Sequence, residues 1–113
     1  MATVCVVFMT APDEETAALL TGTVVEAGLA ACGNLIPSVR SIYRWQGTLH
    51  DDAEVLVIFK TTSERVDALR ESLVDLHPYD CPEVLVINTD GGHPDYLSWV
   101  AESVRSGTAQ RKD

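Results

Sequence analysis

Three short runs of this chain are apolar at every position, and they constrain the fold more than any other feature. Residues 4–9, 55–59 and 84–87 contain only Val, Leu, Ile, Phe, Met and Cys. Each run is short and consists mostly of β-branched and aromatic residues, which predicts strands rather than helices. A strand that is apolar on both sides is buried on both faces of its sheet. The sequence therefore predicts a sheet with two apolar faces.

Helical periodicity separates these strands. Residues 13–27 and 62–76 repeat apolar side chains at spacings of three and four, so each predicts a helix with one apolar side. The pattern Thr61-x-x-Glu64 matches a capping box at the start of the second helix. A third helix is expected from Pro94, because proline suits a first helical turn. The expected inward residues of the three helices are Ala17, Leu20, Val24 and Ala27; Val66, Leu69, Leu73 and Leu76; and Tyr96, Leu97, Val100 and Val104.

The middle of the chain predicts two more strands. Residues 31–36 form a short strand that Pro37 stops, and residues 39–45 alternate polar and apolar side chains. Turns are expected at Gln46-Gly47 and at His50-Asp51-Asp52. The resulting order predicts an α+β fold: a ferredoxin-like split β-α-β sandwich with an antiparallel sheet and an extra C-terminal helix. Residues 1–105 form one domain, and residues 106–113 are expected to be a disordered tail.

In this fold, one apolar face of the sheet is left without helices to cover it. Two helices cover only one face of such a sheet, yet three strands are apolar on both faces. The second face would present a large apolar patch to water, which monomers rarely do. We therefore expect the third helix or another subunit to cover it.

Charge and cysteine content narrow the possible partners and compartment. Seventeen acidic and 8 basic residues give a net charge of -9, which repels nucleic acid and anionic membranes. The longest apolar run is far below the roughly 18 residues of a membrane span. No Lys or Arg precedes Arg40 to flank a signal peptide, and three cysteines without a C-x-x-C pair indicate reduced thiols. We expect a cytoplasmic protein without nucleic-acid or membrane partners.

One segment concentrates metal-ligand chemistry. Residues 77–83 contain His77, Cys81 and Glu83, and copper and zinc favour imidazole and thiolate ligands. Prolines prevent His77 and Cys81 from sharing a helix face. The alternative is that His77 only completes the last turn of a helix, where positive charge is favourable. This alternative is preferred within one subunit, because no full ligand set is visible.

Three further residues are candidates for an interface or a cleft. Tyr43 and Trp45 either stack on a ligand or anchor a subunit interface, and the interface is favoured because such aromatics are enriched there. Lys60 ends an apolar strand and either pairs with Glu54 or Glu83 across a subunit cleft or points to solvent. No nucleophile-elbow, H-E-x-x-H or P-loop motif is present, so an enzyme is not expected. The alternative is an enzyme that uses Cys32 or Cys81 with His77, because such pairs meet only in space.

A series of short motifs resembles one known family, the CutA divalent-cation-tolerance proteins. The resemblance extends from about Thr3 to Arg105, and its specificity lies in the order and spacing of the motifs. They are Thr10-Ala-Pro-Asp-Glu14, Leu29-Ala-Ala-Cys32, Asn34-Leu-Ile-Pro37, Tyr43-Arg-Trp45 with Gly47, Lys60-Thr-Thr62, His77-Pro-Tyr79 with Pro82-Glu83, and Asp95-Tyr-Leu-Ser-Trp99.

The resemblance implies a homotrimer of ferredoxin-like subunits with a non-enzymatic role in metal binding or signalling, in response to copper and other heavy metals. In some members copper ligands occupy positions that correspond here to Met9, Leu76 and His77. Only His77 retains a good ligand, so bound copper or another divalent cation is expected to be held weakly. The alternative function is a trimer that resembles PII signalling proteins and binds a small-molecule effector in clefts between subunits.

Overall fold

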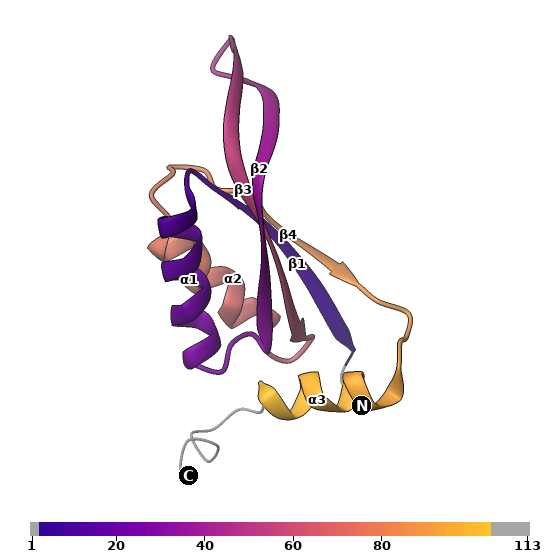
Figure 1. Ribbon diagram of the computed structural model, residues 1–113. Helices are drawn as coiled ribbons and strands as arrows, with labels where there is room; N and C mark the ends of the chain where they lie inside the picture. Colours follow the sequence, from indigo (N-terminus) through magenta and orange to yellow (C-terminus); the bar gives the residue numbers. More distant parts are fainter. Residues whose placement is uncertain (1–2, 105–113) are drawn as a thin grey trace.

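The computed structural model describes residues 3–104, and its elements follow the predicted order (Figure 1). The expected disordered tail, residues 106–113, lies outside the described residues. The elements of the described part are β1 (Val4–Ala11), α1 (Glu14–Glu26), β2 (Cys32–Trp45), β3 (Thr48–Thr62), α2 (Val66–Leu76), β4 (Val84–Asn88) and α3 (Pro94–Ser103).

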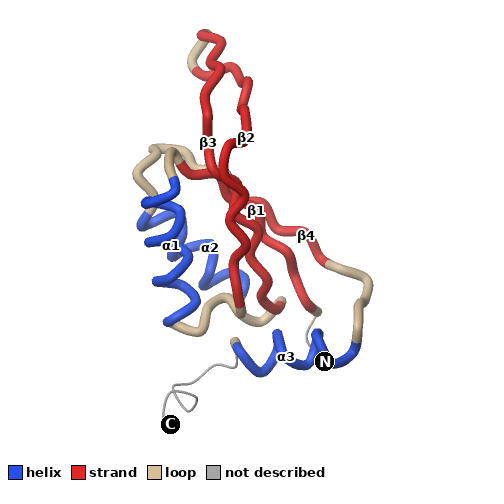
Figure 2. The backbone as a smooth tube through the Cα atoms, viewed as in Figure 1, coloured by secondary structure: helices blue, strands red, loops and turns tan. Residues whose placement is uncertain are grey.

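The four strands form one antiparallel sheet in the order β2-β3-β1-β4. Figures 1 and 2 show α1 and α2 side by side on one face of this sheet, while the β2–β3 hairpin extends beyond it as an arm. Helix α3 lies across the end of the sheet opposite the arm. The predicted α+β, ferredoxin-like arrangement with an extra C-terminal helix is therefore confirmed.

The main core lies between the sheet and the two helices. Alternate residues of β1 and β3 point into it, and the side chains of Phe59 and Met9 are the largest that are fully buried. The helices contribute most of their predicted inward residues, but Ala27, Leu76 and Tyr96 are exposed instead. The helical residues of this core are Ala17, Leu20, Val24, Leu69 and Leu73.

The other face of the sheet is also apolar, as predicted, and we call it the open face. Its residues alternate with those of the core and lie opposite one another in register, as with Phe8 and Ile58. Leu85 on β4 remains 57% exposed. Within residues 3–104, α3 covers only the end of this face, where Val100 and Val104 pack on Val4. The open face consists of Val6, Phe8, Ile36, Leu56, Ile58, Leu85 and Ile87.

The predicted strand break at Pro37 and the predicted turn at residues 50–52 are both wrong. Strand β2 runs through Pro37 with a register shift between Ile36 and Val39, and Ser38 takes a φ of 68°. Proline is tolerated there because β2 is an edge strand, where a backbone donor can be absent. Residues 50–52 belong to β3 and pair with β2 in the arm. The polar composition of these three residues had suggested a turn. The turn itself is at Gln46-Gly47, as predicted, where both residues have positive φ.

The helix starts give one confirmation and one correction. Asp13 caps α1, because its carboxylate accepts a hydrogen bond from the Thr16 backbone N–H at 2.8 Å. The predicted capping box of α2 is absent: β3 continues through Thr62, and the helix begins only at Val66, after Arg65, which makes no side-chain cap. Thr61, the first residue of the predicted box, lies in strand β3 and therefore cannot cap α2.

Packing against Gly33 on β2 yields a stability prediction. A Cβ atom at this position would lie 2.7 Å from the Thr21 Cγ2 atom and 3.1 Å from the Phe59 ring. We expect Gly33→Ala to lower the free energy of unfolding by about 1–3 kcal/mol through overpacking. Urea denaturation measures the change. Gly22→Ala is the matched control: it has open space around it in α1, and we expect it to stabilise by about 0.5–1 kcal/mol. Equal effects of the two variants would contradict this packing.

Candidate functional site

A cavity of about 530 Å³ lies at the base of the arm, between β2, β3 and the segment that follows α2. It brings together four of the predicted site residues: Tyr43, Trp45, Cys81 and Glu83. The other two, His77 and Lys60, do not line it. The residues that line this cavity are Thr10, Ser41, Ile42, Tyr43, Trp45, Glu54, Tyr79, Asp80, Cys81 and Glu83.

His77 is buried beside this cavity, and hydrogen bonds hold both of its ring nitrogens. Nδ1 accepts the backbone N–H of Tyr79 at 3.1 Å, and Nε2 lies 2.8 Å from the carbonyl oxygen of Thr10. An acceptor at Nδ1 and a donor at Nε2 define the neutral Nε2–H tautomer. The residue is also the C-cap of α2, which fits the alternative that it completes the helix. A metal would have to displace one of these two bonds.

The two weaker ligand candidates lie nearer to solvent. Cys81 is an exposed free thiol and Glu83 an exposed carboxylate, and both line the cavity. Among residues 3–104, no group of three or more His, Cys, Asp or Glu side chains is close enough to hold a metal ion. Metal ligation by His77, Cys81 and Glu83 therefore stays a prediction.

The wall of the cavity contains a buried carboxylate that the sequence suggested only as a possible partner of Lys60. Glu54 is only 8% exposed, and the Tyr79 hydroxyl donates a hydrogen bond to its Oε2 at 2.6 Å. Burial, and then this bond, raise the pKa of Tyr79, so the phenol stays protonated at neutral pH. The only sequence signal was a carboxylate placed immediately before the apolar run 55–59.

A second phenol–carboxylate pair stands on the arm. The Tyr43 hydroxyl donates to Asp52 Oδ2 at 2.6 Å, which raises the pKa of Tyr43 to about 12. One face of the Tyr43 ring stacks on His50, with ring centroids 5.0 Å apart. Beside this pair, Arg40 donates two hydrogen bonds to the Asp51 carboxylate. The Tyr43–Asp52 bond orders the Tyr43 ring at the cavity wall, whereas Arg40 and Asp51 do not line the cavity.

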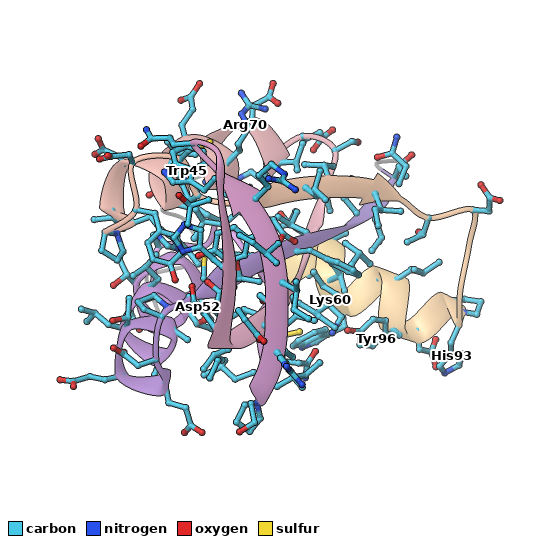
Figure 3. All side chains as sticks on the ribbon, turned by 90° about the horizontal axis from the view of Figure 1, so that it is seen from above. Trp45, Asp52, Lys60, Arg70, His93 and Tyr96 are labelled. Carbon is cyan, nitrogen blue, oxygen red and sulfur yellow. The ribbon has the colours of Figure 1, made fainter. Side chains whose placement is uncertain are left out.

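Lys60 lies at the opposite end of β3, next to α3. Figure 3 shows it beside Tyr96 and away from Trp45. Its Nζ donates to the Asn34 side-chain oxygen, and it lies opposite Cys32 in register. The Cys32 sulfur is 3.9 Å from the Tyr96 hydroxyl oxygen. Within the described chain Lys60 makes no ion pair with Glu54 or Glu83, and the alternative that it pairs with one of them across a subunit cleft stays untested.

The length and composition of the helices show whether any of them could span a membrane. In residues 3–104 none of them has both the length and the apolar character that a membrane crossing needs.

Comparison with known proteins gives a consistent result. The chain matches the family model described as CutA1 divalent ion tolerance protein over residues 5–103. It is 48% identical over 100 residues to the divalent-cation tolerance protein CutA of Escherichia coli O139:H28, covering 88% of this chain and 89% of that protein. It is 47% identical over 106 residues to protein CutA of Mus musculus, covering 90% of this chain but only 60% of the mouse protein's length. The crystal structure of CutA1 from Oryza sativa has a TM-score of 0.89 and 39% identity, covering 93% of this chain and 96% of that chain.

Proposed function

Because the chain belongs to the CutA1 divalent ion tolerance family, we propose that it acts in the tolerance of copper and other divalent metal ions, without catalytic turnover. The observation that carries this proposal is the family match over residues 5–103. The name of the Escherichia coli relative, a divalent-cation tolerance protein, supports the same role. The acidic chain, with a net charge of -9, attracts cations generally.

In this proposal the metal binds weakly near the base of the arm. Cys81 and Glu83 offer a thiol and a carboxylate, and His77 contributes an imidazole after giving up one of its two hydrogen bonds. Exchanging a hydrogen bond for a metal–nitrogen bond lowers the net gain on binding, as does a ligand set that is incomplete within one subunit. Weak binding suits a protein that signals or buffers.

The proposed assembly is a homotrimer, and the proposed compartment is the cytoplasm. The open face supports the assembly, because its exposed apolar residues are typical of a surface that another subunit covers. The three cysteines support the compartment: Cys5, Cys32 and Cys81 are all free thiols, as expected under reducing conditions.

A second candidate function is effector binding, as in PII-like trimers, and the size of the cavity favours it. About 530 Å³ is far more than a metal ion needs, and it lies within the range of small-molecule sites. In this case metal tolerance would be an indirect outcome of effector binding.

The metal proposal is tested by titrating metal-free protein with Cu(II) and Zn(II) and following binding by native mass spectrometry, which reports assembly as well. We expect saturable, weak Cu(II) binding that His77→Ala largely removes while the trimer persists. His93→Ala is the matched control, because His93 is an exposed imidazole at the start of α3. Unchanged Cu(II) binding in His77→Ala would contradict this ligand assignment.

A further inference from the structure

The cavity at the base of the arm has an aromatic lining that a metal site does not require. Tyr43 and Trp45 come from β2, and Tyr79 comes from the segment after α2. Aromatic rings attract cations through the negative charge of their faces, and the attraction is strongest for weakly hydrated organic cations. Hydrogen bonding of the Tyr43 and Tyr79 phenols to carboxylates shifts electron density toward the rings, which strengthens this attraction.

The charge of the lining has one sign. Glu54, Asp80 and Glu83 line the cavity, and no Lys, Arg or His does. Glu54 is the most enclosed of these carboxylates, because it is only 8% exposed. One of its two carboxylate oxygens accepts no hydrogen bond in the described chain. Tyr79 bonds its Oε2, and no donor in the described chain reaches its Oε1. Oε1 is not sealed from solvent, so a cation that enters the cavity can pair with it.

An inorganic cation makes little use of the aromatic rings that line the cavity. In the described residues no three metal-ligating side chains converge, and a bare divalent ion needs a shell of close ligands. A cation with apolar substituents needs no such shell, because its methyl or methylene groups contact the rings while its charge is balanced by carboxylates.

We infer that the cavity binds an organic cation, an ammonium group with apolar substituents, between the rings of Tyr43, Trp45 and Tyr79 and the carboxylate of Glu54. This inference deepens the second candidate function, effector binding, and names the chemical class of the effector. Cys81 and Glu83 line the cavity and also belong to the proposed Cu(II) site at His77, but the three rings and Glu54 do not belong to that site.

Tetramethylammonium is the probe, and Trp45 is the reporter. Trp99→Phe serves as the background, because it leaves Trp45 as the only tryptophan of the chain. Tetramethylammonium chloride is added against sodium chloride at equal ionic strength, and Trp45 fluorescence is followed. We expect a saturable change. We expect Glu54→Gln, which keeps an acceptor for Tyr79, to weaken binding by about tenfold or more, the scale of losing one close charge in a partly desolvated cation site.

Three controls make the result decisive. Glu102→Gln removes the same charge from an exposed position on α3, and binding should be unchanged. tert-Butanol has nearly the shape of the probe but no charge, and it should not bind. If Glu54→Gln fails to fold, Tyr43→Leu on the exposed arm tests the aromatic part and should weaken binding several-fold.

The outcomes separate this inference from the metal proposal. Absence of saturation by tetramethylammonium overturns the inference, as does equal binding of tert-butanol or an equal effect of Glu54→Gln and Glu102→Gln. The Cu(II) titration is run separately on the same variants. Loss of Cu(II) binding in His77→Ala with tetramethylammonium binding retained supports two distinct ligand chemistries at the base of the arm.

Discussion

Phe59→Ala is expected to lower the free energy of unfolding by about 3–5 kcal/mol, the range for removing a large aromatic from a packed core. Phe59 is the largest fully buried side chain and lies on β3, the strand between β2 and β1. It lies opposite Val7 in register and packs where Gly33 leaves room for its ring. Its removal leaves a cavity in the core between the sheet and the helices.

Urea denaturation measures this loss, and Leu49→Ala on the same strand is the control. Leu49 is 65% exposed on the arm, so its truncation should change the free energy of unfolding by no more than about 0.5 kcal/mol. If Phe59→Ala is too unstable to fold, Phe59→Leu should still cost roughly 1 kcal/mol, as a swap that nearly conserves volume. A loss below about 1 kcal/mol for Phe59→Ala would contradict the assignment of this residue to the centre of the core.

The sequence predicts the central strands of this fold better than the arm, for a physical reason. A run such as residues 55–59 is apolar on both sides because both faces of the sheet are apolar, so its pattern depends little on its neighbours. The arm lies beyond the helices, and its strands carry polar side chains that pair locally, as Arg40 does with Asp51. Polar residues in a strand that faces water on both sides resemble a turn, and the tertiary pairing that makes them a strand is not visible in the sequence.

The candidate site shows the same limit. Tyr43, Trp45, Cys81 and Glu83 were all predicted, but their meeting in one cavity depends on how the segment after α2 returns to the base of the arm. Glu54 and Lys60 are six residues apart on one strand, which separates them by roughly 20 Å at a strand's rise per residue. One site in a subunit cannot contain both, so Lys60 lies at the other end. The pairing of Glu54 with Tyr79, 25 residues away, required the fold.

Ile58→Glu is expected to abolish the proposed trimer. Ile58 is half-buried at the centre of the open face, opposite Phe8 on one side and Asn34 on the other. In a single subunit a carboxylate there still reaches water, so the fold should survive, as circular dichroism would show. When another subunit covers the face, the same carboxylate is buried without a partner, which costs several kcal/mol at each copy. Light scattering at micromolar concentration should then give the mass of a monomer.

Leu19→Glu is the matched control, because it places the same charge on the outer surface of α1, where Leu19 is 68% exposed. It should leave the mass of the trimer unchanged. A wild-type protein that scatters as a monomer, or an Ile58→Glu variant that assembles as well as Leu19→Glu, would contradict the proposal that other subunits cover the open face. Dissociation of Ile58→Glu alone would assign the assembly to this face, because Leu19→Glu places the same charge away from it.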